Sequence, residues 1–176
     1  MATFRNKGID CFSNGCHGNL MSFYDPETYT PERSVGYLIK ICNQLGMTVL
    51  DRIFAPEGLN TSQWSALMAI HHHVEPTCAV VARDLSHDKG AMTRMMDALE
   101  AKGWVERTRS EDDRRVLRLS LTPAGHAVMT RCRDLTVDYW NRCLADWSAP
   151  EIESFLAQLQ KLRRTLEDIA TCPCSD

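Results

Sequence analysis

Apolar residues recur at steps of three and four along most of this chain, the spacing of a helix that buries one face. One long stripe covers residues 35–53 and follows Thr30-Pro31-Glu32, where threonine is expected to cap the helix and proline to fill its first turn. Another covers residues 152–169 and follows Ser148 and Glu151, which have the spacing of a capping box. The pattern predicts a mainly α-helical protein with long helices near both ends.

Three shorter helices and one further long helix are predicted between these stripes. The first short helix starts near Asn60 or Thr61 and stops before Pro76, and the second is capped by Thr77. The inward positions of the second are expected to be Ala79, Val80, Ala82 and Leu85. The third follows a break at Ser86-His87-Asp88, ends at Gly103, and has an apolar face of Met92, Met95, Met96 and Leu99. Thr122-Pro123 opens the further long helix, which is expected to reach about Trp147.

After Gly103 the apolar pattern changes from the helical period to the alternation of a strand. Trp104–Arg109 and Val116–Leu121 are predicted strands, and Leu117, Leu119 and Leu121 are expected to point to one side. The wholly polar residues 110–115 form the tip of this hairpin. Short helices that lead into a helix with one apolar face, followed at once by a hairpin, are the layout of a winged helix-turn-helix.

The predicted elements divide the chain by function. Residues 59–121 are expected to form a winged helix-turn-helix lobe with a small β-hairpin wing, and residues 30–58 and 122–171 a helical dimerisation region. The apolar stripes of the first and last helices lie outside the lobe, so a monomer would expose them, and large exposed apolar patches usually mark interfaces. Residues 1–29 are an N-terminal extension, and residues 172–176 a C-terminal Cys-x-Cys tail.

The helix before the wing is the candidate reading element for duplex DNA. An α-helix fits the major groove, and a hairpin tip can reach the backbone or the adjacent minor groove. The face opposite the methionines is polar and cationic, which is either an ordinary solvated surface or a DNA contact, and the hairpin directly after it favours DNA. The candidate DNA-binding residues are His87, Asp88, Lys89, Gly90, Thr93, Arg94, Arg114 and Arg115.

Two stretches resemble the MarR family of bacterial transcription regulators. They are LSHDKGAMTRMMDALEAKGWVER at residues 85–107 and SEDDRRVLRLSLTPAG at residues 110–125. The second contains the family's wing motif, Asp-x-Arg, five residues, then Leu-Thr, as Asp113, Arg115, Leu121 and Thr122. The resemblance implies a homodimer with interleaved first, fifth and sixth helices, which represses or activates transcription at a pseudo-palindromic double-stranded operator, with repression as the favoured reading. It also implies release by a small aromatic or phenolic effector, or by cysteine oxidation.

The resemblance also suggests roles for residues in the wing and in the second helix. Asp113 and Arg115 are expected to shape the wing, with Asp113 orienting an arginine, while Arg114 reaches DNA. The effector is expected to contact Trp64, Met68 and His71, because the second helix borders the family's effector pocket. His71, His72 and His73 point in three directions on a helix, so they are not expected to share one metal ion.

Charge permits a DNA-binding face but does not demonstrate one. The chain has a formal net charge of −3, and residues 83–118, with nine Lys and Arg against eight Asp and Glu, are the one stretch that is not acidic. No apolar run is long enough to span a bilayer, and the N-terminus lacks the apolar core of a signal peptide, so a cytoplasmic protein without a membrane partner is expected. No catalytic pattern stands out, so an enzyme is not expected.

The cysteines raise an alternative function. Cys11, Cys16, Cys172 and Cys174 lie in the terminal segments and could hold Zn²⁺ or an iron–sulfur cluster, with His17 as a spare ligand. The alternatives are a thiol redox switch and incidental cysteines in two tails. Cys42, Cys132 and Cys143 are expected to be buried, and the helix dipole could lower the pKa of Cys78. The competing reading is therefore a metal-, cluster- or redox-sensing regulator, and a third is a winged helix used only for protein contacts.

Overall fold

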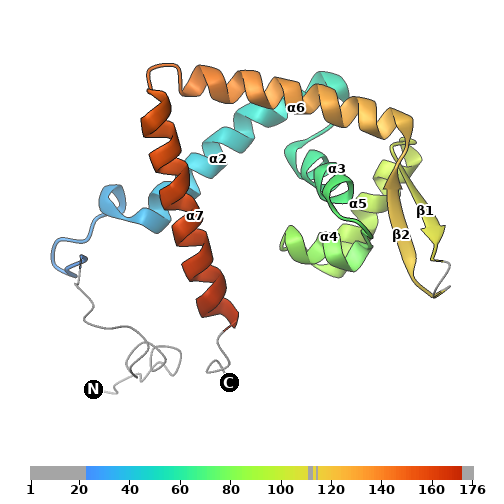
Figure 1. The fold of residues 1–176 in the computed structure, drawn as a ribbon, viewed down its shortest axis with the longest axis horizontal. Coiled ribbons are helices and arrows are strands. Elements are labelled where there is room, and N and C mark those ends of the chain that lie inside the picture. The colour runs from blue at the N-terminus through green and yellow to red at the C-terminus, as the bar shows by residue number, and fades with distance from the viewer. Residues whose placement is uncertain (1–22, 111–112, 114, 172–176) are drawn as a thin grey trace. The chain divides into compact units, whose positions relative to one another are not determined.

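The computed structural model describes residues 23–110, 113 and 115–171 (Figure 1). The chain divides into two compact units, of which one comprises Val35–Cys143 and the other comprises Met1–Ser34 together with Leu144–Asp176. In the described part of the chain, no helix is both long and apolar enough to cross a membrane. The predicted fold class is confirmed: the described elements are helices and one antiparallel hairpin.

The larger unit begins with α2 (Val35–Phe54), which covers the predicted first stripe. The predicted start at Pro31 is wrong, because Pro31–Arg33 forms a separate 3-10 turn, η2, and Ser34 has extended backbone with φ −89° and ψ 118°. Thr30 makes no side-chain capping hydrogen bond. Proline suits the first turn of a 3-10 helix as well as that of an α-helix, so Pro31 alone could not reveal the break at Ser34.

The next two helices begin at the predicted places. After η3 (Ala55–Glu57) and Gly58, whose φ is +73°, Asn60 forms a capping box with Gln63 at the start of α3 (Thr61–His72). The Thr77 hydroxyl accepts a hydrogen bond from the Val80 amide at the start of α4 (Cys78–Asp84). The inward face of α4 was predicted wrongly at one position, because Ala79 is exposed and Val81 is fully buried.

The hairpin joins the lobe through both of its strands. β1 (Val105–Arg109) pairs antiparallel with β2 (Leu117–Leu121), with Val105 opposite Leu121. The Leu119 amide also donates to the Pro76 carbonyl oxygen at 2.8 Å, so β2 is anchored to the segment before α4. Leu119 and Leu121 are buried as predicted, but Leu117 is exposed because it lies toward the tip.

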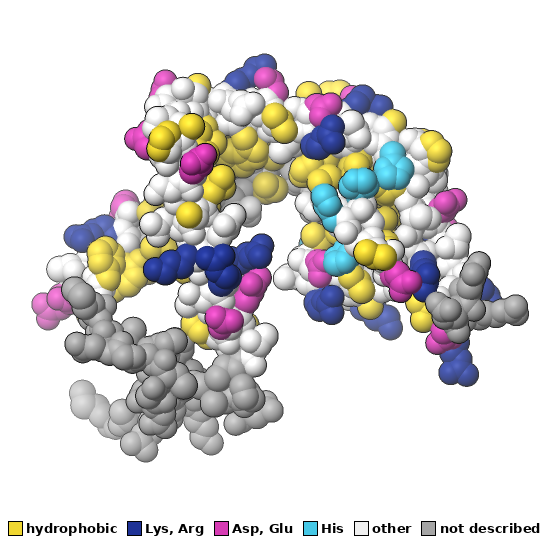
Figure 2. Space-filling model, viewed as in Figure 1, with side chains coloured by type: hydrophobic (Ala, Val, Ile, Leu, Met, Phe, Trp, Pro, Cys, Tyr) yellow, Lys and Arg dark blue, Asp and Glu magenta, His cyan; other side chains and the backbone are white. Residues whose placement is uncertain are grey.

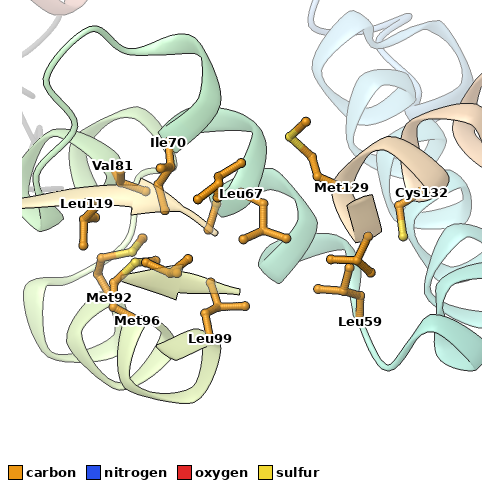
Figure 3. Packing of buried hydrophobic residues seen from close by; sticks show 14 of the residues in the cluster. Leu59, Leu67, Ile70, Val81, Met92, Met96, Leu99, Leu119, Met129 and Cys132 are labelled. Carbon is orange, nitrogen blue, oxygen red and sulfur yellow. The ribbon is translucent and has the colours of Figure 1, made fainter. Parts of the chain in front are cut away.

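The core forms among α3, α4, α5 (Lys89–Ala101), β1 and β2, with α5 packed on α4 and β1 (Figure 3). Met92, Met96 and Leu99 are fully buried, as the spacing of apolar positions predicted. The core continues along α6 (Pro123–Cys143) through Val128, Met129 and Cys132. Burial of this apolar face, at roughly 25 cal/mol per Å² of apolar area, therefore holds α5 in place. The polar face lies on the opposite side of the helix.

The two helices after the wing differ in how they pack. α6 ends at Cys143, earlier than the predicted Trp147, and its Trp140 ring lies close against Gly46 of α2. α7 (Ala149–Thr171) belongs to the smaller unit and has no buried residue. Its predicted start is confirmed, since the Ser148 amide and hydroxyl both donate to Glu151 Oε2, at 2.8 and 2.7 Å.

We predict that Gly125→Ala destabilises the larger unit. A Cβ at Gly125 would collide with the carbonyl oxygen of Trp104 and lie 2.9 Å from its carbonyl carbon. Because backbone must move to relieve the clash, the free energy of unfolding should fall by about 1–3 kcal/mol in urea titration. Gly36→Ala is the control, because no atom lies within 4 Å of a Cβ there. Equal stability of the two variants would contradict the prediction.

Candidate nucleic-acid interface

Asp88 sets the start of α5. Its Oδ1 accepts a hydrogen bond from the Ala91 amide at 2.9 Å, which makes it the helix N-cap. Hydrogen bonds from the backbone, first that of Ala91 and then that of Gly90, together with the nearby charges of Arg94 and His87, hold the pKa of Asp88 below its usual value of 3.8. The carboxylate predicted to contact DNA therefore has a structural role at the helix terminus.

The polar face of α5 is exposed along its first two turns. Lys89, Gly90, Thr93 and Arg94 are all exposed, and His87 before the helix is partly buried. The Thr93 hydroxyl donates to the Lys89 carbonyl oxygen at 2.8 Å. Arg94 Nη1 lies 3.7 Å from the place that a Cβ on Gly90 would occupy, so the arginine extends toward the helix N-terminus. The result is an exposed cationic face with two basic side chains and a small central residue.

The wing tip is shaped by Asp113. Its Oδ1 accepts from the Arg115 amide at 2.9 Å, and its carbonyl oxygen accepts from the Val116 amide at 2.9 Å. The Asp113 carboxylate therefore contacts the backbone of Arg115. Arg115 itself is exposed. Arg114 lies outside the described residues. In Figure 2, basic side chains border the undescribed part of the tip.

Known proteins share this arrangement. The model of the MarR family matches residues 59–117. The multiple antibiotic resistance protein MarR of Escherichia coli is 31% identical over 129 residues, which are 73% of this chain and 90% of that protein. This chain belongs to the MarR family. The family assignment and the winged-helix fold predicted from the sequence are thereby confirmed, and the relatives are transcription regulators rather than enzymes.

Solved structures similar to this MarR-family protein include two bound to DNA. A mutant MarR from E. coli complexed with operator DNA is 31% identical, with a TM-score of 0.65 over 73% of this chain and 92% of that one. The transcriptional repressor CouR bound to a 23-mer DNA duplex is 26% identical, with a TM-score of 0.69 over 75% of this chain and 94% of that one.

The sequence did not reveal one contact between α5 and the wing of this MarR-family protein. Arg107 on β1 binds Asp97 of α5 at 2.6 Å and Glu100 at 3.2 Å. The sequence positions of these three residues do not by themselves predict a pairing, because the contact depends on how the hairpin folds over the helix. Arg107 therefore ties the wing to the helix whose face is the candidate interface.

The three predicted effector residues have different surroundings. Trp64 packs against Phe54, with ring centroids 5.5 Å apart, and its Nε1 donates to the Met129 carbonyl oxygen at 3.2 Å. Met68 packs against the core, while His71 is exposed with its ring 5.4 Å from that of His126. A groove of about 370 Å³ lies elsewhere and is lined by Glu57, Arg131, Asp134, Leu135 and Asp138.

The cysteines of this MarR-family protein differ in their surroundings. Cys132 is buried as predicted, and burial raises its pKa to about 11, whereas Cys42 and Cys143 are exposed because they lie on solvent-facing positions of α2 and α6. Burial also raises the pKa of Cys78, so the suggestion that the helix dipole lowers it is wrong. The terminal cysteines predicted as metal ligands lie outside the described residues, within which no cluster of three metal-binding side chains occurs.

We predict that the capping role of Asp88 depends on pH. Its pKa is lower in the folded protein, so its contribution to stability is complete above the ordinary value and is lost as pH falls through the folded value. Asp88→Ala should therefore lower urea stability at neutral pH, with a smaller difference in strong acid. Asp88→Asn keeps a side-chain oxygen that can accept the capping hydrogen bond but removes the charge. Asp146→Ala, at an exposed residue, is the control. A loss with Asp88→Ala that is the same at every pH would refute the assignment.

Proposed function

We propose that this chain represses transcription by binding a double-stranded operator as a homodimer, with α5 in the major groove and the wing on the adjacent backbone or minor groove. The observation that carries the proposal is the exposed cationic face of α5, which lies opposite its buried methionine face. An α-helix held in this way can present Lys89, Thr93 and Arg94 to base edges and phosphates. The DNA-bound MarR and CouR structures support the same use here.

Two chains are proposed to bind each operator. α7 has 23 residues and buries none of them, although Phe155, Leu156 and Leu166 are apolar. α2 exposes a similar set, which includes Val35, Leu38 and Leu45. Apolar helix faces of this kind indicate contact with a second copy, so residues 30–58 and 122–171 remain our proposed dimerisation region and residues 59–121 the DNA-binding lobe.

The wing and the helix have different roles in this proposal. Asp113 holds the turn, so that Arg114 and Arg115 reach the DNA backbone from the tip. His87, Asp88 and Gly90 shape the entry to α5, where Gly90 allows close approach of the helix to the groove. Backbone contacts of this kind orient the protein, whereas Arg94 is placed to contact a base.

A small aromatic or phenolic effector is proposed to release the operator. Trp64 supports a binding place between α3 and α6, because its indole nitrogen donates to the α6 backbone at Met129. His71 adds an exposed imidazole beside His126 at the start of α6. A weakly acidic ring bound against Trp64, Met68 and His71 would therefore alter the packing of α3 on α6.

We predict that Arg94→Ala weakens operator binding by about 1–3 kcal/mol if the guanidinium contacts a base. Fluorescence anisotropy with a labelled operator duplex measures the change. Arg142→Ala is the control, because that side chain is 78% exposed on α6, outside the proposed reading face. Circular dichroism checks that each variant is folded. An affinity equal to that of the unmodified protein would mean that this face is only solvated.

We predict that hydroxybenzoates quench tryptophan fluorescence and lower operator affinity in the same concentration range. Trp64→Phe should remove most of the quenching, and His71→Ala should weaken the effect on operator affinity. The control is Trp147→Phe, since Trp147 packs on Phe155 in the smaller unit. If Trp64→Phe and His71→Ala leave both effects unchanged, the binding place is wrong.

A further inference from the structure

The polar face of α5 carries one acidic residue close to its main candidate DNA contact. Asp97 follows Arg94 by three residues, a spacing at which opposite charges on a helix readily pair. Arg94 nevertheless extends away from Asp97, toward Gly90 and the carboxylate of Asp88. Arg94 therefore does not form the ion pair with Asp97 that their spacing on α5 would allow.

Arg107, on the neighbouring strand β1, binds Asp97 instead. Its Nη2 donates to Asp97 Oδ1 at 2.6 Å, and its Nη1 lies 3.2 Å from Glu100 Oε2. The planar guanidinium fork can bind two carboxylates at once, which an ammonium group cannot match in geometry. Its side chain is 20% exposed, so its pairing with Asp97 is less screened by water than a pairing between exposed side chains on the helix surface.

The arginine is not well suited to a purely structural role. Its Nε is buried and has no hydrogen-bond acceptor among the described residues. A buried donor without a partner costs free energy, and an apolar side chain of similar length would remove that cost. Arg107 is therefore better explained by its effect on the charges of α5 than by a contribution to the stability of the wing.

We propose that Arg107 is a positioning residue for DNA binding: it occupies Asp97 and Glu100, and so prevents Asp97 from pairing with Arg94 on the reading face. The assignment rests on the proposed DNA-binding function and gives a residue of the wing strand a role in it. Loss of Arg107 would leave a negative charge on the face that meets phosphates, and would draw Arg94 back along the helix toward Asp97. Both effects weaken binding through Asp97.

The test is whether removing Asp97 rescues the loss of Arg107. The probe is a duplex selected from a random pool with the unmodified full-length protein, and affinity is measured by fluorescence anisotropy. Arg107→Met should lower affinity roughly tenfold or more, whereas Asp97→Asn should bind as well as the unmodified protein or better. The affinity of the double variant Arg107→Met/Asp97→Asn should recover to within about threefold of that of Asp97→Asn. The four affinities together form a double-mutant cycle.

A merely structural Arg107 gives a different result. In that case the double variant binds as weakly as Arg107→Met, and the assignment is overturned; unchanged affinity in Arg107→Met overturns it as well. Arg131→Met is the matched control, because it removes another arginine–carboxylate pair, to Glu57 at 2.8 Å, that involves neither α5 nor the wing. Because this pair lies in the proposed dimerisation region, the control is read by coupling rather than by affinity alone: adding Asp97→Asn to Arg131→Met should change affinity by the same factor as adding it to the unmodified protein.

Two further comparisons keep the result interpretable. If Arg107→Met does not fold by circular dichroism, Arg107→Lys with and without Asp97→Asn replaces it, since lysine offers one point charge instead of a fork. Rescue by Asp97→Asn supports the assignment there too, and its absence overturns it. If the unmodified protein selects no duplex, the proposed function fails together with this assignment, whereas DNA binding without rescue overturns this assignment alone.

Discussion

The clasp between the end of α5 and the start of α6 determines where the wing can lie. The Thr122 hydroxyl donates to the Gly103 carbonyl oxygen at 2.6 Å, and the Thr122 amide donates to the Trp104 carbonyl oxygen at 3.1 Å. Gly125 lies directly against this backbone, where no side chain fits. Because the clasp joins the two ends of the hairpin, the strands leave α5 and enter α6 at a fixed place.

The acidic side chains of α5 and of its N-cap, which are Asp88, Asp97 and Glu100, are all engaged, which reconciles a chain of net charge −3 with a DNA-binding function. Asp88 accepts from the α5 backbone, and Arg107 binds Asp97 and Glu100. Affinity for a polyanion then depends on the local order of charges rather than on their sum. Lys89 and Arg94 are the basic side chains that this order leaves on the exposed face of α5.

The sequence could predict those parts of the fold that depend on local chemistry. Four predicted features depend on neighbours within a few residues, and the structure confirms them: the start of α3 near Asn60, the cap at Thr77, the methionine stripe of α5 and the alternation of β2. Where distant contacts decide, the sequence was insufficient. Ser34 interrupts the first helix, and Val81 replaces Ala79 in the core because of how α4 packs.

The same distinction applies to the candidate site. The exposed residues of α5 could be identified from their spacing, because the opposite face is plainly apolar. The pairing of Arg107 with Asp97 could not, since it joins two elements whose approach is set by the hairpin. The orientation of Arg94 is likewise a consequence of what surrounds it rather than of its own position.

In the proposed function, two copies of α5 and its wing bind one duplex together. The most direct measurement is the mass of the complex by light scattering, with a duplex selected from a random pool by the full-length protein. We expect two chains per duplex and an enriched pseudo-palindrome with half-sites one helical turn, ~34 Å, apart. A single chain bound tightly to the duplex, or a pool in which no sequence is enriched, would contradict it.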